Sequence, residues 1–154
     1  ANSGTAGYWG GGGVVTGSYQ SVVDKLTFAT DAVSTLGTGL SVARNYPSGM
    51  ANSGTAGYVL GGHTGSPSAV VDKFAFSDDS RTTLGTGLSS ARYAGGAFAD
   101  SGVAGYVGGG NDGSTNVTTV NKFAFADDSR TTLGTGLSAT SQFTAGWANS
   151  AALA

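Results

Sequence analysis

The sequence TLGTGLSVAR at residues 35–44 returns as TLGTGLSSAR at residues 83–92 and as TLGTGLSATS at residues 132–141. Three near-identical copies of one decapeptide in a chain of 154 residues indicate that a larger unit has been repeated. The third copy ends in Ser141, whereas the first two end in arginine. The fold therefore depends on what the whole repeated unit contains.

The repetition extends on both sides of this decapeptide. Gly-Tyr pairs recur at Tyr8, Tyr58 and Tyr106, and the lysines Lys25, Lys73 and Lys122 are 48 and 49 residues apart. We divide the chain into three repeats, at about residues 1–50, 51–98 and 99–147, within a single domain that spans residues 1–154.

Each repeat contains four short segments with the composition of β-strands. The first is small and apolar, at Tyr46–Ala51, Tyr93–Ala99 and Phe143–Ala148. In the second repeat the others are GYVLGG (57–62), VVDKFAF (70–76) and Thr82–Leu88, separated by turn-forming residues. No segment has a hydrophobic period of 3.6 residues, so we expect an all-β fold. Four strands in about 50 residues are typical of a β-propeller blade.

These residues resemble the kelch repeat. The shared features are two glycines that end the second strand, an aromatic third strand, and a leucine-spaced fourth strand followed by arginine. In order, they are Gly11, Gly12, Gly61, Gly62, Gly109 and Gly110, then Phe28, Phe76 and Phe125, then Leu36, Leu84 and Leu133, then Arg44 and Arg92. The chain lacks the tryptophan that usually opens the fourth strand of kelch repeats. Its glycine-rich style is similar to repeats of phage tail fibres and bacterial surface proteins, which favours an extracellular or virion-surface location.

The resemblance implies three four-stranded blades, whereas propellers have about 4–8. Residues 142–150 have the composition of a spare first strand, and the first repeat opens at the end of one. We therefore expect two chains to associate head to tail as a six-bladed ring, each donating residues 142–150 to the first blade of its partner. A ring of three chains is the alternative. The phenylalanines are expected between blades together with Leu36, Leu40, Leu84, Leu88, Leu133 and Leu137, each contributing about 1.5–3 kcal/mol on burial.

The length differences between repeats fall in one place, between the paired glycines and the third strand. The loops there are Gly13–Ser21, His63–Ala69 and Asn111–Thr118. In a four-stranded blade they lie on the same face as the links between blades, and variable loops on one face often mark a binding surface. The candidate ligand-binding residues are Tyr19, Gln20, Arg44, His63, Arg92, Asn111, Asp112 and Asn116.

Such polar loops with an occasional aromatic suit a glycan or the loops of a surface protein. The alternative is that they vary freely without a ligand, and that the arginines hydrogen-bond neighbouring loops. Ser141 fits either a relaxed structural requirement or an asymmetric site. We therefore keep two functions open, a multivalent recognition module and a purely structural repeat scaffold.

The composition argues against several other functions. The chain has one histidine, no cysteine and a net charge of -2, so we expect no enzyme activity, no metal or other cofactor, and no nucleic-acid partner. No apolar run reaches the roughly 20 residues of a membrane helix, so we expect no membrane insertion. The Asp78-Asp79 and Asp127-Asp128 pairs provide too few oxygens for calcium, and we expect them to form turns.

Overall fold

The computed structural model describes residues 4–148, and within this range the chain is entirely β-sheet and loop. No helix in that range is long and apolar enough to cross a membrane. The strands form three antiparallel sheets, one for each repeat, and in every sheet the strands are adjacent in chain order. The all-β prediction is therefore confirmed.

The first sheet has three strands and the other two have four each. The first sheet consists of β1 (Ala6–Gly10), β2 (Val23–Thr27) and β3 (Ala32–Thr35). The second sheet consists of β4 (Ser48–Asn52), β5 (Ala56–Leu60), β6 (Val71–Ala75) and β7 (Arg81–Thr83). The third sheet consists of β8 (Gly96–Asp100), β9 (Ala104–Gly108), β10 (Val120–Ala124) and β11 (Arg130–Thr132).

The strand that opens each four-stranded sheet begins later than expected. β4 starts at Ser48 rather than at Tyr46, and β8 starts at Gly96 rather than at Tyr93. The reason is local, because Tyr46 has φ 50° and Ala94 has φ 57°, in the left-handed region that interrupts a strand. Phe143 has φ 54°, and the third expected segment, Phe143–Ala148, forms no strand. Residues 149 and 150 of the expected spare strand lie outside the described range.

The last strand of the second sheet is shorter than the sequence predicts. β7 ends at Thr83, and the following LGTGL segment runs on as an irregular chain. It still follows the third strand, since the Leu84 amide donates to the Val71 carbonyl at 2.9 Å and the Leu88 amide donates to the Ala69 carbonyl at 2.8 Å. Gly87 allows this close approach, because a Cβ there would collide with the Ala69 carbonyl.

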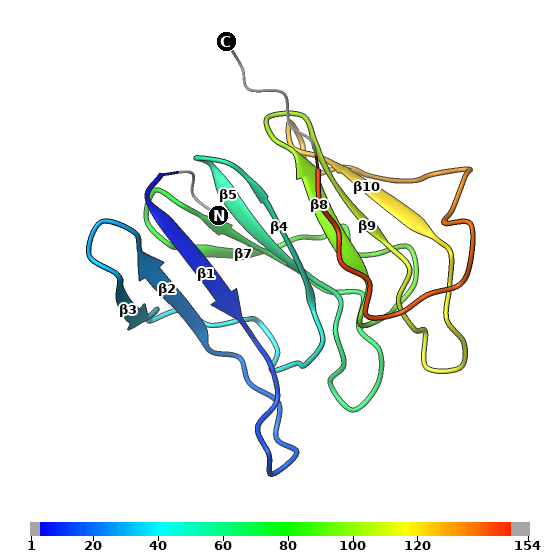
Figure 1. Cartoon of the computed structure of the whole chain (residues 1–154), viewed down its shortest axis with the longest axis horizontal. Coiled ribbons are helices and arrows are strands. Elements are labelled where there is room, and N and C mark those ends of the chain that lie inside the picture. The colour runs from blue at the N-terminus through cyan, green and yellow to red at the C-terminus, as the bar shows by residue number, and fades with distance from the viewer. Residues whose placement is uncertain (1–3, 149–154) are drawn as a thin grey trace.

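The three sheets stand side by side like the ribs of a fan (Figure 1). The opening strands β4 and β8 are neighbours, and the chain after β11, red in Figure 1, runs along β8. One hydrogen bond repeats at these contacts. The Ala94 amide donates to the Tyr46 carbonyl at 2.9 Å, and the Phe143 amide donates to the Ala94 carbonyl at 2.6 Å. Residues 143–148 therefore lie beside β8 much as β8 lies beside β4.

Two hydrophobic clusters fill the spaces between sheets. The smaller, between the first and second sheets, contains Val23, Leu40 and Phe74. The larger, between the second and third, contains Met50, Ala56, Tyr58, Leu60, Val71, Leu88, Val107, Phe123 and Phe125.

Phe76 and Phe125 are buried as expected, each with 9% exposure. Phe28, Leu133 and Leu137 are 43%, 36% and 37% exposed in the single chain, so their burial between blades stays a prediction. They belong to the two outer sheets, each of which has only one neighbouring sheet among residues 4–148.

The paired glycines end the second strand of each sheet, as the sequence predicts. Gly61 and Gly62 have φ angles of 62° and 108°, a region that side chains rarely adopt. The Arg92 carbonyl oxygen lies 2.5 Å from where a Cβ of Gly61 would stand. The pair therefore turns the chain sharply while the link to the next sheet passes against it.

Candidate functional site

The three variable loops project from one edge of the molecule (Figure 1). The links between sheets lie against them, since Asn45 forms an antiparallel bridge with His63 and Tyr93 forms one with Asn111. The expected convergence of loops and links on one face is therefore present. We call this surface the loop face.

Five aromatic side chains form a continuous row across the loop face. In order, they are Tyr19, His63, Tyr93, Tyr46 and Phe143, and we call them the aromatic row. Successive ring centroids lie 5.8, 5.1, 6.2 and 5.5 Å apart. Three of these contacts are edge-to-face, a geometry that aromatic rings favour. The row joins two variable loops, the two links between sheets and the segment after the third sheet, so it connects parts of the chain that are far apart in sequence.

The two ends of the aromatic row differ. At one end the Tyr19 hydroxyl lies 3.2 Å from His63 Nδ1, which also accepts a hydrogen bond from the Gly65 amide at 3.3 Å. At the other end Tyr46 is 52% exposed and Phe143 is 63% exposed. Both of these residues have positive φ, which is strained for an aromatic residue. Ala94 has φ 57° at the equivalent position of the second repeat, so this backbone conformation belongs to the repeat and not only to the exposed rings.

The predicted polar residues of the third loop hold that loop together. Asn111 Nδ2 donates to Asn116 Oδ1, and Asn111 Oδ1 accepts from the Gly113 amide, both at 2.8 Å. Asp112 accepts from the amides of Ser114 and Thr115 at 2.9 and 2.8 Å. The backbone hydrogen bonds from Thr115 and Ser114 lower the pKa of the Asp112 carboxyl. These groups fix the shape of a loop beside the aromatic row.

Gln20 contributes through its backbone. Its amide donates to the Gly12 carbonyl at 2.8 Å, and its own carbonyl accepts from the Arg44 amide at 3.0 Å. The residue is half-buried. It therefore ties the first loop to the first link, and the structure gives its side chain no place in the aromatic row.

The expected display of Arg44 and Arg92 on the loop face is wrong, because the two residues are 0% and 1% exposed. Arg44 reaches into the second sheet, where Nη2 donates to Asp72 Oδ2 at 2.9 Å and to the Val59 carbonyl at 3.2 Å. Arg92 makes the equivalent contacts in the third sheet, with Asn121 Oδ1 at 3.0 Å and the Val107 carbonyl at 3.4 Å. Both arginines therefore join neighbouring sheets through strand residues, and not through the neighbouring loops that the structural alternative named.

The two arginine sites differ in charge. Burial raises the pKa of Asp72, but hydrogen bonds from Thr83 and Ser41 and the charge of Arg44 outweigh it, so this pKa is below its ordinary value. At the second site the partner is the neutral Asn121. Burial, with a smaller repulsion from Arg130, lowers the pKa of Arg92 to about 10. The third sheet thus buries a guanidinium beside an amide, where the second sheet provides a carboxylate.

The Asp-Asp turns join the sheets in a way the sequence analysis did not anticipate. Asp79 accepts from the Tyr8 hydroxyl at 2.8 Å and pairs with Lys25 at 2.6 Å, both from the first sheet. Asp128 accepts from Tyr58 at 2.8 Å and pairs with Lys73 at 2.7 Å, in the same arrangement one sheet further along. Both aspartates have positive φ. The repeated signal was visible in the sequence, since in each repeat a lysine of the third strand precedes an aspartate of the turn by six residues.

Within residues 4–148 no group of three or more metal-ligating side chains comes together. No protein-family model matches the chain, and no curated protein is significantly similar to it in sequence.

Proposed function

We propose that the chain is a non-catalytic recognition module built from four-stranded, kelch-like β-propeller blades, which assembles with itself and binds a glycan through its loop face. The observation that carries this proposal is the aromatic row, with two exposed rings at one end and hydrogen-bonded polar loops beside it. A sugar ring packs its apolar C–H face on an aromatic ring while its hydroxyls bond to amides and hydroxyls.

The polar groups of the loop face favour binding over acid–base chemistry. Asp112 already accepts two backbone hydrogen bonds, and His63 Nδ1 contacts both Tyr19 and the Gly65 amide. These groups orient loops, and such orientation supports a preformed binding surface. Several loop faces in one assembly supply avidity even when each single site is weak.

A glycan array followed by titration calorimetry on the best ligand tests the proposal. Tyr46→Ala is expected to weaken binding by about tenfold or more, because it removes an exposed ring from the row. Val103→Ala is the matched control, since Val103 is 56% exposed but belongs to the β8–β9 turn. An array without binding, or equal affinity for wild type and Tyr46→Ala, contradicts the proposal.

The second candidate function is a structural scaffold without a ligand. The burial of Arg44 and Arg92 favours it, because two residues expected on the loop face join sheets instead. Exchange of the loop 63–69 for 111–118 separates the two functions. If the chain is a scaffold, neither the wild type nor the variant binds a ligand, and both have the same stability. If the chain is a recognition module, the wild type binds a ligand that the equally stable variant does not bind.

A further inference from the structure

The same set of contacts joins the first sheet to the second and the second sheet to the third. The outer faces of the first and third sheets lack this set among the described residues. The tyrosine and lysine of one sheet bind the turn aspartate of the next, as Tyr8 and Lys25 bind Asp79. The tyrosine ring also stacks on a phenylalanine of the next sheet. The Tyr8–Phe76 and Tyr58–Phe125 centroids lie 5.1 and 5.4 Å apart.

The third sheet has the tyrosine and lysine of this contact, but no aspartate from a further sheet lies against them in the described part of the chain. Tyr106 and Lys122 occupy the positions of Tyr8 and Lys25, and among residues 4–148 Lys122 is in no ion pair. Leu133 and Leu137, beside them in the repeat, are 36% and 37% exposed. Leu88, the second-repeat equivalent of Leu137, is 7% exposed because the third sheet covers it.

The first sheet has the turn aspartate of this contact, but no tyrosine and lysine from another sheet lie against it in the described part of the chain. Asp31 matches Asp79 and Asp128 in sequence position and in its positive φ of 53°, and in the described part of the chain it forms no ion pair. Phe28 matches Phe76 and Phe125 but is 43% exposed, where they are 9% exposed. Trp9 and Val33 on the same sheet are 60% and 61% exposed. This face is apolar and acidic, and it complements the apolar, basic face of the third sheet.

The free edge of the first sheet completes the match. β5 and β9 each pair with an opening strand, whereas β1 pairs with β2 alone among the described strands. Met50 stands opposite Tyr58, and Phe98 stands opposite Tyr106. Trp147 is the next residue in this register, since Met50, Phe98 and Trp147 are 48 and 49 residues apart. Trp147 is 83% exposed, and its register partner is Tyr8, on the unpaired edge of β1.

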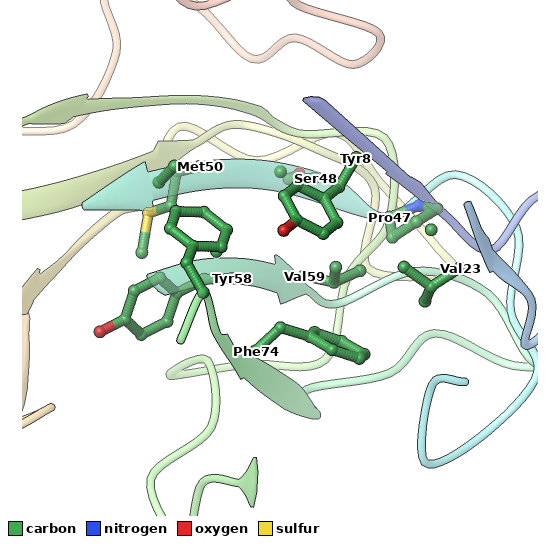
Figure 2. A pocket seen from close by; sticks show the side chains of 13 residues that line it. Tyr8, Val23, Pro47, Ser48, Met50, Tyr58, Val59 and Phe74 are labelled. Atoms are coloured by element: carbon green, nitrogen blue, oxygen red, sulfur yellow. The ribbon is translucent and has the colours of Figure 1, made fainter. Parts of the chain in front are cut away.

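A pocket of about 290 Å³ lies between the first and second sheets, at the side of this edge (Figure 2). Its lining includes Tyr8, Gly57 and Tyr58 together with the β4 residues Ser48–Ala51. The contact between the second and third sheets shows which kind of side chain fills the equivalent space. Met50 from β4 lies against Gly105, where a Cβ would collide with its sulfur. Gly57 is the second-sheet equivalent of Gly105, so a strand paired with β1 brings its aromatic residue over Gly57.

We propose that a second copy of this chain docks its third sheet on the first sheet of its partner, with residues 145–148 paired to β1 and Trp147 in this pocket. Lys122 and Tyr106 then bind Asp31, and Tyr106 stacks on Phe28. Ser138, the equivalent of Ser41 and Ser89, donates to Asp24, the equivalent of Asp72 and Asn121. Applied in both directions, the contact closes a two-fold ring of six sheets.

This inference rests on the self-assembly in the proposed function and names its surface. Its first test is the solution mass of the 154-residue chain by light scattering at micromolar concentration. The expected value is twice 15.0 kDa. A wild-type monomer overturns both the docking and the proposed self-assembly. Neither result involves a glycan, so a failed glycan array leaves this test unaffected.

Charge exchange tests the surface itself. Asp31→Lys and Lys122→Asp are each expected to weaken self-association by about tenfold or more, because each places like charges opposite one another. Mixed together, the two variants are expected to form dimers, since one interface is then wild type and the other carries the exchanged pair. A ring of three copies always retains one mismatched contact and is not rescued. Single variants that dimerise like wild type, or mixtures that stay monomeric, overturn the proposed contact.

Trp147→Ala tests the pocket. A buried tryptophan at an interface is typically a dominant contact, so we expect a loss of self-association of about 30-fold or more. Val15→Ala, in an exposed part of the first loop, is the control and is expected to leave the dimer unchanged. The melting temperature of each variant, measured on its monomer, separates lost docking from lost folding. A Trp147→Ala dimer as tight as wild type overturns the pocket assignment.

Discussion

Arg44 donates a 2.9 Å hydrogen bond to Asp72 with both side chains fully buried between two sheets. The arginine comes from the link after the first sheet, and the aspartate is the second residue of β6. The Asp72 carboxylate also accepts from Thr83 and from the amide and hydroxyl of Ser41. The carboxylate is thus fully hydrogen-bonded, whereas Arg44 Nε and Nη1 are buried without a partner in the described part of the chain. The pair links the two sheets through Nη2 alone.

The third sheet offers a direct test, because Asn121 occupies the place of Asp72. Asn121→Asp is expected to stabilise the protein by about 1–2 kcal/mol, because the Arg92 guanidinium gains a charge-assisted partner. Ser89 and Thr132, which now contact Asn121, can donate to the new carboxylate as Ser41 and Thr83 do to Asp72. Urea denaturation at neutral pH measures the change. A loss of stability would show that the desolvation of the new carboxylate outweighs these bonds.

The reverse change at the second sheet is the matched experiment. Asp72→Asn leaves Arg44 beside an amide, as Arg92 is now, and is expected to destabilise the protein by about 1–3 kcal/mol. The difference from wild type depends on pH. The pKa of Asp72 is below its ordinary value of 3.8, so its stabilisation is complete above that value and is lost as pH falls through the folded pKa. Denaturation curves from pH 7 to 2 are expected to converge at the acid end, and a constant gap contradicts this assignment.

The strand composition and the repeat predicted the all-β fold and the position of each sheet, because apolar alternation is a local property of the chain. The burial of the arginines was not predicted, although the sequence contains a signal for it. Asp72 alternates onto the same strand face as Phe74 and Phe76. An acidic side chain on an apolar face requires a buried partner of opposite charge. The link that leads into the second sheet contains one cation, Arg44.

The aromatic row was predicted only in part. Tyr19 and His63 lie in the first and second variable loops and were candidates for that reason. Tyr46, Tyr93 and Phe143 are the first residues of the three predicted small apolar strands. Because they were assigned to strands, they were not considered as binding residues. The left-handed φ of Tyr46 and Phe143 moves these residues out of the strand and onto the loop face. A backbone conformation of this kind depends on neighbouring sheets, which a single repeat does not specify.

The paired glycines provide a test of backbone constraint. Gly61→Ala is expected to cost about 2 kcal/mol or more, because the residue has φ 62° and the Arg92 carbonyl occupies the space of a Cβ. Gly85→Ala is the matched control within the same repeat, since its φ is not in the left-handed region and no heavy atom lies within 4 Å of its Cβ position. It is expected to leave stability within about 0.5 kcal/mol of wild type. Thermal melts of both variants decide the comparison, and equal losses contradict it.

Ser141 is the third-repeat equivalent of Arg44 and Arg92, and the docking of a second copy gives its identity a consequence. In the proposed assembly we expect Ser141 to lie near Asp24 of the partner subunit, since Asp24 is the first-sheet equivalent of Asp72. Ser141→Arg is therefore expected to supply the missing ion pair and to tighten self-association by about tenfold. Its backbone contact, the Gly110 amide donating to the residue 141 carbonyl at 2.7 Å, is retained in the variant. The double variant Ser141→Arg with Asp24→Asn is expected to lose most of the gain. Sedimentation equilibrium on the three proteins measures the effect, and an equal gain with and without Asp24 would place the new arginine elsewhere.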